Sequence, residues 1–117
     1  NATASGGRLS VTHDIRDGYE GADVVYANSW GALPYYGDPE REWNLSRAYA
    51  RVIVDGGKMA MTNKAIFSHC LPLRRNVEAT DAVLDAPSCV AIDEAENRLH
   101  VQKALMLRLL GVAARST

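Results

Sequence analysis

The residues best suited to chemistry in this chain follow two short apolar runs. The first run, residues 65–67, leads into His69 and Cys70, and the second, residues 88–92, ends shortly before Arg98. The carboxyl ends of parallel strands meet at one edge of an α/β sheet, where such sheets hold their ligands. The pattern therefore predicts one site that joins a polar loop after one strand to a basic side chain after another.

Two interpretations of His69 and Cys70 are open. Either both side chains face a ligand, or Cys70 is a core thiol beside a hydrogen-bonded histidine, since free cysteine is among the most buried residue types. A zinc site needs three or four suitably spaced ligands. These two residues, taken with Cys89 and His100, do not provide that spacing, so no metal is expected. A Cys–His nucleophile pair is disfavoured because neighbouring strand residues point to opposite faces.

Basic residues at two places in the chain could bind an anion. Arg74 and Arg75, which follow Pro72, form either an anion clamp or a solvated turn. Arg98 is expected in the first turn of the last helix, where unpaired backbone N–H groups already favour negative charge. In that position it either contacts a bound anion or forms a surface ion-pair cluster with Glu94 and Glu96.

The loop at residues 29–34 sets Trp30 among small residues and a proline. This composition fits a mobile loop that covers a substrate, and it fits a packed Ω-loop equally well.

Alternating strand and helix patterns predict the fold class. Apolar runs indicate four strands, at residues 9–13, 22–27, 65–69 and 88–92. Helical patterns fall between and after them, at residues 14–19 with Asp14 as the cap, 42–51, 58–62, 80–84 with Thr80 as the cap, and 94–110; residues 52–54 are expected to be extended. Strands that alternate with helices imply an α/β fold with a doubly wound, Rossmann-like parallel sheet. Because sheets carry about five or six strands on average, the chain is expected to be the later, incomplete part of such a domain.

Length and charge restrict the classes of partner. The 117 residues, with 13 basic and 14 acidic side chains, suggest one domain or part of one. The chain has no block of like charge and no apolar run near the ~18 residues that span a bilayer, so neither nucleic acid nor membrane is expected as a partner. The two cysteines are expected to stay reduced, as in a cytoplasmic protein.

Four segments stand in a distinctive order along the chain. They are ADVVY at residues 22–26, SWGALP at residues 29–34, HCLP at residues 69–72 and EAENR at residues 94–98. Together they resemble the second, ornithine-side domain of the aspartate/ornithine carbamoyltransferase family. The tryptophan loop and HCLPLRRN resemble the branch that acts on N-acetylornithine in arginine biosynthesis.

The resemblance implies a mechanism. An amine of the acylated ornithine attacks the carbonyl carbon of carbamoyl phosphate, and phosphate leaves from a tetrahedral intermediate. Arg98 would contact the carbamoyl phosphate oxygens, while backbone atoms of Cys70 and Leu71, beside His69, would orient the carbamoyl amide and the amine. Arg74 would bind the substrate carboxylate or the acyl group. Such chemistry depends on positioning and charge stabilisation, and no organic cofactor is implied.

Further substrate contacts are implied for Asn28, Ser29, Trp30, Pro72 and Glu78. Two of these residues depart from the branch, which usually carries lysine where this chain has Asn28 and Glu78. Loss of the positive charge at residue 28 is expected to weaken carboxylate binding or to shift substrate preference.

The family's carbamoyl phosphate domain, with its Ser-x-Arg-Thr phosphate loop, has no counterpart in residues 1–117. Family active sites also borrow residues from a neighbouring subunit, so a homo-oligomer is expected. The chain is therefore expected to be the ornithine-side part of a carbamoyltransferase, inactive in isolation. The alternative is a non-catalytic small-molecule-binding or interaction module that kept the fold.

Overall fold

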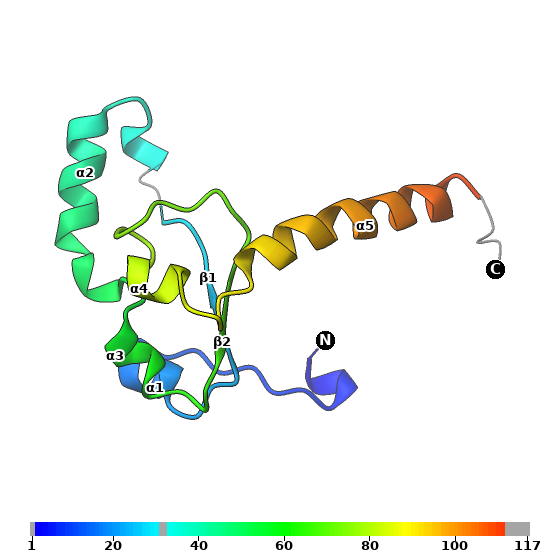
Figure 1. The fold of residues 1–117 in the computed structure, drawn as a ribbon, viewed down its shortest axis with the longest axis horizontal. Coiled ribbons are helices and arrows are strands. Elements are labelled where there is room, and N and C mark those ends of the chain that lie inside the picture. Colours follow the sequence, from blue (N-terminus) through cyan, green and yellow to red (C-terminus); the bar gives the residue numbers. More distant parts are fainter. Residues whose placement is uncertain (1, 31–32, 112–117) are drawn as a thin grey trace.

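The computed structural model describes residues 2–30 and 33–111, and a two-stranded parallel sheet lies at its centre. Strand β1 (Val24–Ala27) pairs with strand β2 (Ile66–His69), from Val24 opposite Ile66 to Ala27 opposite His69. Both strands therefore end at the same edge of the sheet (Figure 1). We call this edge the carboxyl rim.

Helices lie on both sides of the sheet and beyond its carboxyl rim (Figure 1). The α-helices are α1 (Ile15–Tyr19), α2 (Pro39–Ala48), α3 (Gly56–Met59), α4 (Asp81–Leu84) and α5 (Ala91–Leu109). Short 3₁₀ helices occur at Thr3–Ser5, Leu33–Tyr35 and Ala50–Val52. Helices α1, α3 and α4 cover one face of the sheet and α5 leaves from the other, so the predicted doubly wound arrangement is confirmed (Figure 1).

The core lies on the face of the sheet that α1, α3 and α4 cover. Phe67 is fully buried at its centre and packs in a cluster with Val54, Ala79 and Val83, and Tyr19 of α1 packs against this cluster. Val54 also forms a parallel bridge with Ala79. The predicted extension at residues 52–54 is thus partly correct: Val52 ends a 3₁₀ helix, whereas Ile53 and Val54 follow it outside the helix.

The strand predicted at residues 9–13 is wrong. Within the described part of the chain these residues pair with no strand, and Leu9 and Val11 are 81% and 83% exposed. The continuous apolar run at residues 22–27 is of the kind that parallel sheets bury on both faces, but Val24 and Tyr26 of β1 are 53% and 55% exposed. Among the described residues β1 pairs with β2 alone, and no third strand lies along its other edge.

The strand predicted at residues 88–92 is wrong too, although the segment does lie beside β2. Backbone hydrogen bonds of 2.8 Å run from Phe67 N to Ser88 O and from Val90 N to Phe67 O. Helix α5 then begins at Ala91. A short apolar run is compatible with either a strand or the buried start of a helix, and periodicity alone does not separate the two.

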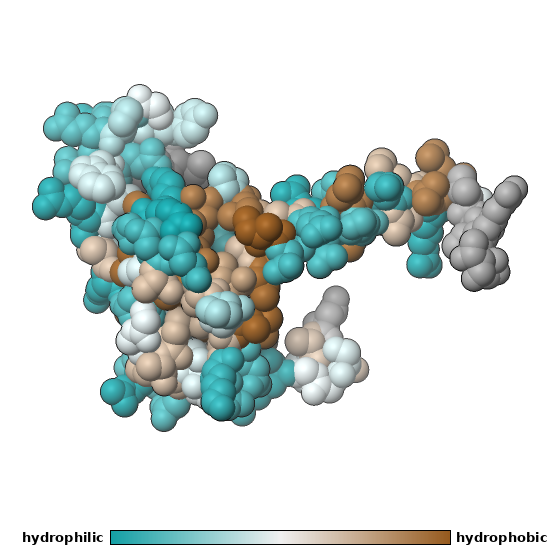
Figure 2. All heavy atoms as spheres, viewed as in Figure 1, coloured by the Kyte–Doolittle hydropathy of each residue, from teal (hydrophilic) through white to brown (hydrophobic). Residues whose placement is uncertain are grey.

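The long helix predicted at residues 94–110 is confirmed as α5, but its leucine side chains are exposed. Ala91 is its only buried residue, whereas Leu99, Leu105 and Leu109 are 58%, 54% and 77% exposed. Apolar side chains can be seen along the helix where it projects from the body (Figure 2). In the described ranges, 2–30 and 33–111, no helix combines the length and the apolar character needed to cross a bilayer.

Aspartate caps explain where the shorter helices begin. Asp14 accepts a hydrogen bond from Arg16 N, as predicted for α1. Asp55 accepts one from Lys58 N at 2.8 Å, so α3 begins at residue 56, earlier than the predicted range of 58–62. Asp38 caps α2 in the same way and moves its start to Pro39. Thr80, in contrast, makes no side-chain cap hydrogen bond to α4.

Asp55 provides a pH-dependent contribution to stability. Hydrogen bonds from the Lys58 ammonium, 2.6 Å away, and from Lys58 N lower the pKa of the Asp55 carboxyl. Its contribution is therefore present above the unfolded-state pKa, about 3.9, and is lost as the pH falls through the lower folded-state pKa. Because the pair is partly solvated, Asp55→Asn is expected to cost less than about 1 kcal/mol at neutral pH. Urea unfolding at a series of pH values should show that the difference in stability between the wild type and Asp55→Asn shrinks in acid. A difference that does not change with pH would contradict the assignment.

Candidate functional site

The HCLP loop leaves β2 at the carboxyl rim in an unusual backbone conformation. Leu71 has a φ of +50°, and the peptide bond between Leu71 and Pro72 is cis. A positive φ costs a leucine about 1–2 kcal/mol, and such residues cluster at functional sites. His69 is fully buried, and its Nδ1 accepts a hydrogen bond of 2.9 Å from Leu71 N. The imidazole thus hydrogen-bonds the loop backbone from within the core and is not exposed to solvent.

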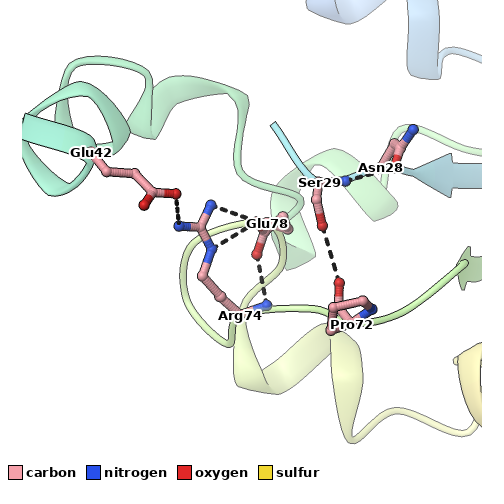
Figure 3. A network of polar contacts seen from close by, with 6 residues as sticks. All are labelled: Asn28, Ser29, Glu42, Pro72, Arg74 and Glu78. Carbon is pink, nitrogen blue, oxygen red and sulfur yellow. Dashed lines mark hydrogen bonds and ion pairs between the residues drawn. The ribbon is translucent and has the colours of Figure 1, made fainter. Parts of the chain in front are cut away.

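Cys70 lies on the opposite side of the strand end, where the loop that follows β1 meets it. Its Sγ is 3.6 Å from Asn28 Oδ1, and it is only partly buried. The two loops are also joined by a hydrogen bond of 3.0 Å from the Ser29 hydroxyl to the Pro72 carbonyl (Figure 3). The loop after β1 and the HCLP loop therefore meet at the carboxyl rim.

Trp30 extends this loop toward the end of α2. Its ring makes an edge-on contact with the ring of Tyr49, at a centroid separation of 6.3 Å. A cavity of about 180 Å³ lies beneath the loop, and its lining includes the predicted residues Asn28, Trp30 and Glu78. Its other lining residues are Tyr19, Val25, Tyr26, Ala27, Val52 and Val54.

Arg74 is held by two carboxylates (Figure 3). Its Nε and one terminal nitrogen donate to Glu78 Oε1 at 3.1 and 2.9 Å, and its backbone N–H donates to Glu78 Oε2 at 2.8 Å. The other terminal nitrogen donates to Glu42 of α2 at 3.1 Å. The hydrogen bond to Glu78 is the largest cause of the raised pKa of Arg74. The predicted anion clamp is thus already neutralised by side chains of the same chain.

Glu78 is expected to matter far more to stability than Glu42, although both bind Arg74. Glu78 is 1% exposed and receives three hydrogen bonds, whereas Glu42 is partly solvated. Glu78→Gln replaces one acceptor oxygen with an NH₂ group, which would face the N–H donors of Arg74. We therefore expect it to lower the free energy of unfolding by about 1–3 kcal/mol. The matched variant Glu42→Gln should cost less than about 1 kcal/mol. Urea unfolding of both variants tests this, and equal losses would contradict the structural role assigned to Glu78.

On the other face of the sheet, Glu94 joins α5 to both strands. The Tyr26 hydroxyl donates to Glu94 Oε1 at 2.9 Å, and the Ser68 hydroxyl donates to Glu94 Oε2. The hydrogen bond from Ser68 is the main cause that lowers the pKa of Glu94, and the charge of Arg98 lowers it further. The hydrogen bond to Glu94 in turn raises the pKa of Tyr26 to about 12, with a smaller contribution from Cys70.

Arg98 lies two turns inside α5 and not in its first turn, so that part of the sequence prediction is wrong. The helix starts at Ala91, which leaves the unpaired N–H groups of its first turn well before Arg98. Arg98 is exposed and lies one turn beyond Glu94, and its charge lowers the pKa of the Glu94 carboxylate. Cys70 and Arg98 are therefore both near the Tyr26–Glu94 contact at the carboxyl rim.

Sequence reasoning missed Tyr26, Ser68 and Glu42 as members of the site. Tyr26 and Ser68 are paired in the register of β1 and β2, so both project to the same face of the sheet. Aligning the ends of the two apolar runs would have found this pair. Nothing in the local pattern connects Glu42 with a residue 32 positions away.

No cluster of three or more His, Cys, Asp or Glu side chains arranged for a metal ion is found in the described segments, 2–30 and 33–111. The polar groups at the carboxyl rim are instead hydroxyl, amide, thiol, guanidinium and carboxylate groups together with loop backbone. Groups of these kinds can orient and hydrogen-bond a ligand.

The fold and the carboxyl rim define an α/β domain whose polar loops lie at the ends of parallel strands, the edge where such sheets hold ligands. A family model described as "Aspartate/ornithine carbamoyltransferase, Asp/Orn binding domain" matches residues 1–109. The chain belongs to the aspartate/ornithine carbamoyltransferase family, as its sequence segments predicted.

Curated relatives show the same relationship at different distances. The chain is 64% identical over 111 residues to N-acetylornithine carbamoyltransferase of Xanthomonas campestris pv. campestris, covering 95% of this chain and 33% of the relative. It is 59% identical to the Xylella fastidiosa (strain 9a5c) enzyme of that name, covering 93% of this chain and 32% of the relative. The chain is 40% identical to chloroplastic ornithine carbamoyltransferase of Pisum sativum, and the match covers 89% of this chain and 27% of the relative. The chain spans about a third of the length of the N-acetylornithine relatives that it matches.

Solved structures agree with the fold class. A crystal structure of acetylornithine transcarbamylase complexed with acetylcitrulline matches with a TM-score of 0.77 at 64% identity, over 92% of this chain and 32% of that chain. A mutant of N-acetyl-L-ornithine transcarbamylase complexed with carbamyl phosphate and N-succinyl-L-norvaline matches with the same score, identity and coverage. The predicted α/β parallel-sheet fold is confirmed.

Proposed function

We propose that this chain is the amino-acid-binding part of a carbamoyltransferase that acts on N-acetylornithine. In the proposed reaction, the side-chain amine of N-acetylornithine attacks the carbonyl carbon of carbamoyl phosphate. The bond from that carbon to the phosphate oxygen breaks, inorganic phosphate leaves, and the amine loses a proton. The product is acetylcitrulline, and the reaction belongs to arginine biosynthesis.

The roles of the residues follow the geometry of the carboxyl rim. Arg98 contacts the oxygens of carbamoyl phosphate, and backbone atoms of Cys70 and Leu71 orient the carbamoyl amide and the amine. His69 acts as a positioning residue, since its buried imidazole accepts the Leu71 N–H. Asn28, Ser29, Trp30 and Pro72 form the substrate-binding side, and Glu78 supports it by holding Arg74. Arg74 orients the substrate carboxylate or acyl group with the two N–H groups that Glu42 and Glu78 leave unused.

One observation carries this proposal: the loop after β1 and the loop after β2 meet at the same rim as the helix that bears Arg98. The contacts that join them are those of Cys70 with Asn28 and of Glu94 with Tyr26. Segments far apart in the sequence thus supply amide, thiol, hydroxyl, carboxylate and guanidinium groups to one edge. A reaction that relies on positioning and charge stabilisation requires groups of this kind.

We further propose that residues 1–117 do not complete the site. The chain spans a third of its N-acetylornithine relatives, and no Ser-x-Arg-Thr segment occurs within it. Carbamoyl phosphate would then be held partly by residues outside these 117. The expected homo-oligomer stays a prediction.

Calorimetry and a product assay test the proposal together. We expect the 117-residue chain to bind a bisubstrate analogue of carbamoyl phosphate and N-acetylornithine, and to bind N-acetyl-L-norvaline more tightly than L-norvaline. We expect no acetylcitrulline from carbamoyl phosphate and N-acetylornithine. Absence of binding heat would contradict the ligand assignment, and product formed by the chain alone would contradict the incomplete site.

The pairing of Arg74 favours a second candidate function, a binding module without catalysis. The guanidinium faces two carboxylates, so the group is less available to an anionic substrate than an unpaired arginine would be. The gene upstream of residue 1 separates the two candidates. An in-frame segment that encodes Ser-x-Arg-Thr supports the enzyme, and a start codon directly before residue 1 supports the module.

A further inference from the structure

Helix α5 is attached to the body only near its beginning. In the described part of the chain, Ala91 is its only buried residue, and its main contact is with β2. Backbone hydrogen bonds of the preceding segment hold Ser88 and Val90 against Phe67. Beyond its first turns the helix projects away from the body (Figure 1). The rotation of α5 about its own axis must therefore be fixed by contacts within those first turns.

Glu94 is suited to fix that rotation. Each of its carboxylate oxygens receives a hydroxyl from a different strand, Oε1 from Tyr26 of β1 and Oε2 from Ser68 of β2. A hydrogen bond to a charged group is roughly twice as strong as one between neutral groups. Two such bonds, from side chains that stand side by side in the register of the sheet, leave the carboxylate little freedom to turn.

Arg98 depends on that rotation. It lies four residues after Glu94, so its Cα is about 6 Å further along the helix and only about 40° away around it. Its charge reaches the Glu94 carboxylate, which agrees with a common side of the helix. If α5 turned by one residue, about 100°, Arg98 would face away from the rim.

We propose that Glu94 is a positioning residue: its carboxylate, held by Tyr26 and Ser68, latches α5 to the strand ends so that Arg98 faces the carboxyl rim. The latch itself is independent of any ligand. Its consequence for binding rests on the proposed function, in which Arg98 contacts carbamoyl phosphate.

Amide hydrogen exchange tests the latch without a ligand. Glu94→Ala is expected to speed exchange in residues 91–98 by at least about tenfold, since two charge-assisted hydrogen bonds are lost. Ser68→Ala and Tyr26→Phe should each give a smaller increase. Glu96→Ala is the matched control, because Glu96 is an exposed acid of the same helix turned about 200° from Glu94. Unchanged exchange in Glu94→Ala, or an equal increase in Glu96→Ala, would overturn the latch.

Binding of the bisubstrate analogue tests the consequence for Arg98. Glu94→Ala is expected to weaken binding about tenfold or more, and the double variant Glu94→Ala/Arg98→Ala should bind no more weakly than Arg98→Ala alone. A merely structural loss would instead add to the loss from Arg98→Ala and would overturn the positioning role. If the wild-type chain binds no analogue, the proposed function fails, and the exchange rates alone decide whether the latch stands.

Discussion

We expect Arg98→Ala to weaken binding of a bisubstrate analogue by about 10- to 100-fold, the equivalent of about 1.5–3 kcal/mol for a lost hydrogen bond to a charged group. Arg98 is exposed on α5 beside the Tyr26–Glu94 contact, where a ligand at the rim can reach it. Because the guanidinium is not buried, its removal should leave the fold intact. Calorimetric titration of the chain with the analogue measures the change.

The matched control for this variant is Arg108→Ala. Arg108 belongs to the last turn of the same helix, far along α5 from the strand ends, and its substitution removes the same charge. Its affinity for the analogue should equal that of the wild type. If both variants lose affinity equally, the effect is one of net charge, and Arg98 has no specific place in the site.

Phe67→Ala is expected to cost about 3–5 kcal/mol, the usual range for truncating a buried aromatic side chain. Phe67 is the largest fully buried apolar side chain among the described residues, and Val54, Ala79 and Val83 surround it. These neighbours are small or branched and are held by β-bridges and a helix, so they cannot collapse far into the cavity. Natural domains are stable by only about 5–15 kcal/mol, so this loss removes much of the total.

Ile66→Ala provides the comparison, because Ile66 is the neighbour of Phe67 on β2 and is 42% exposed. Its truncation should cost less than about 1.5 kcal/mol, since it removes fewer buried methylene groups. Urea unfolding at 25 °C measures both variants. Equal losses would show that the face covered by α1, α3 and α4 is not the main core.

The elements that sequence alone predicted well are those whose signals are local. Asp14 caps α1 by accepting a hydrogen bond from Arg16 N, and the runs before Asn28 and before Cys70 form the two paired strands. Each of these signals lies within a few residues of the structure that it specifies. The alternation of strand and helix patterns was sufficient to predict the α/β fold, and the order of ADVVY, HCLP and EAENR was sufficient to predict the family.

The misses depend on contacts that the sequence does not display. Residues 9–13 have the alternation of a strand, but a strand needs a partner, and the described chain provides none beside them. Arg98 appeared to begin a helix because EAENR follows an apolar run, yet that run is itself the helix start at Ala91. The pairing of Arg74 with Glu42 joins two segments 32 residues apart, and no periodicity marks it.

The central claim is that one ligand surface forms at the carboxyl rim from the loop after β1, the HCLP loop and the start of α5. Amide and arginine side-chain NMR spectra, recorded while the bisubstrate analogue is added, test it most directly. We predict that signals of Ser29, Cys70, Leu71 and the Arg98 guanidinium shift together with a single dissociation constant. Shifts confined to the cleft beside α1, where His13, Ile15 and Tyr19 lie, would contradict it.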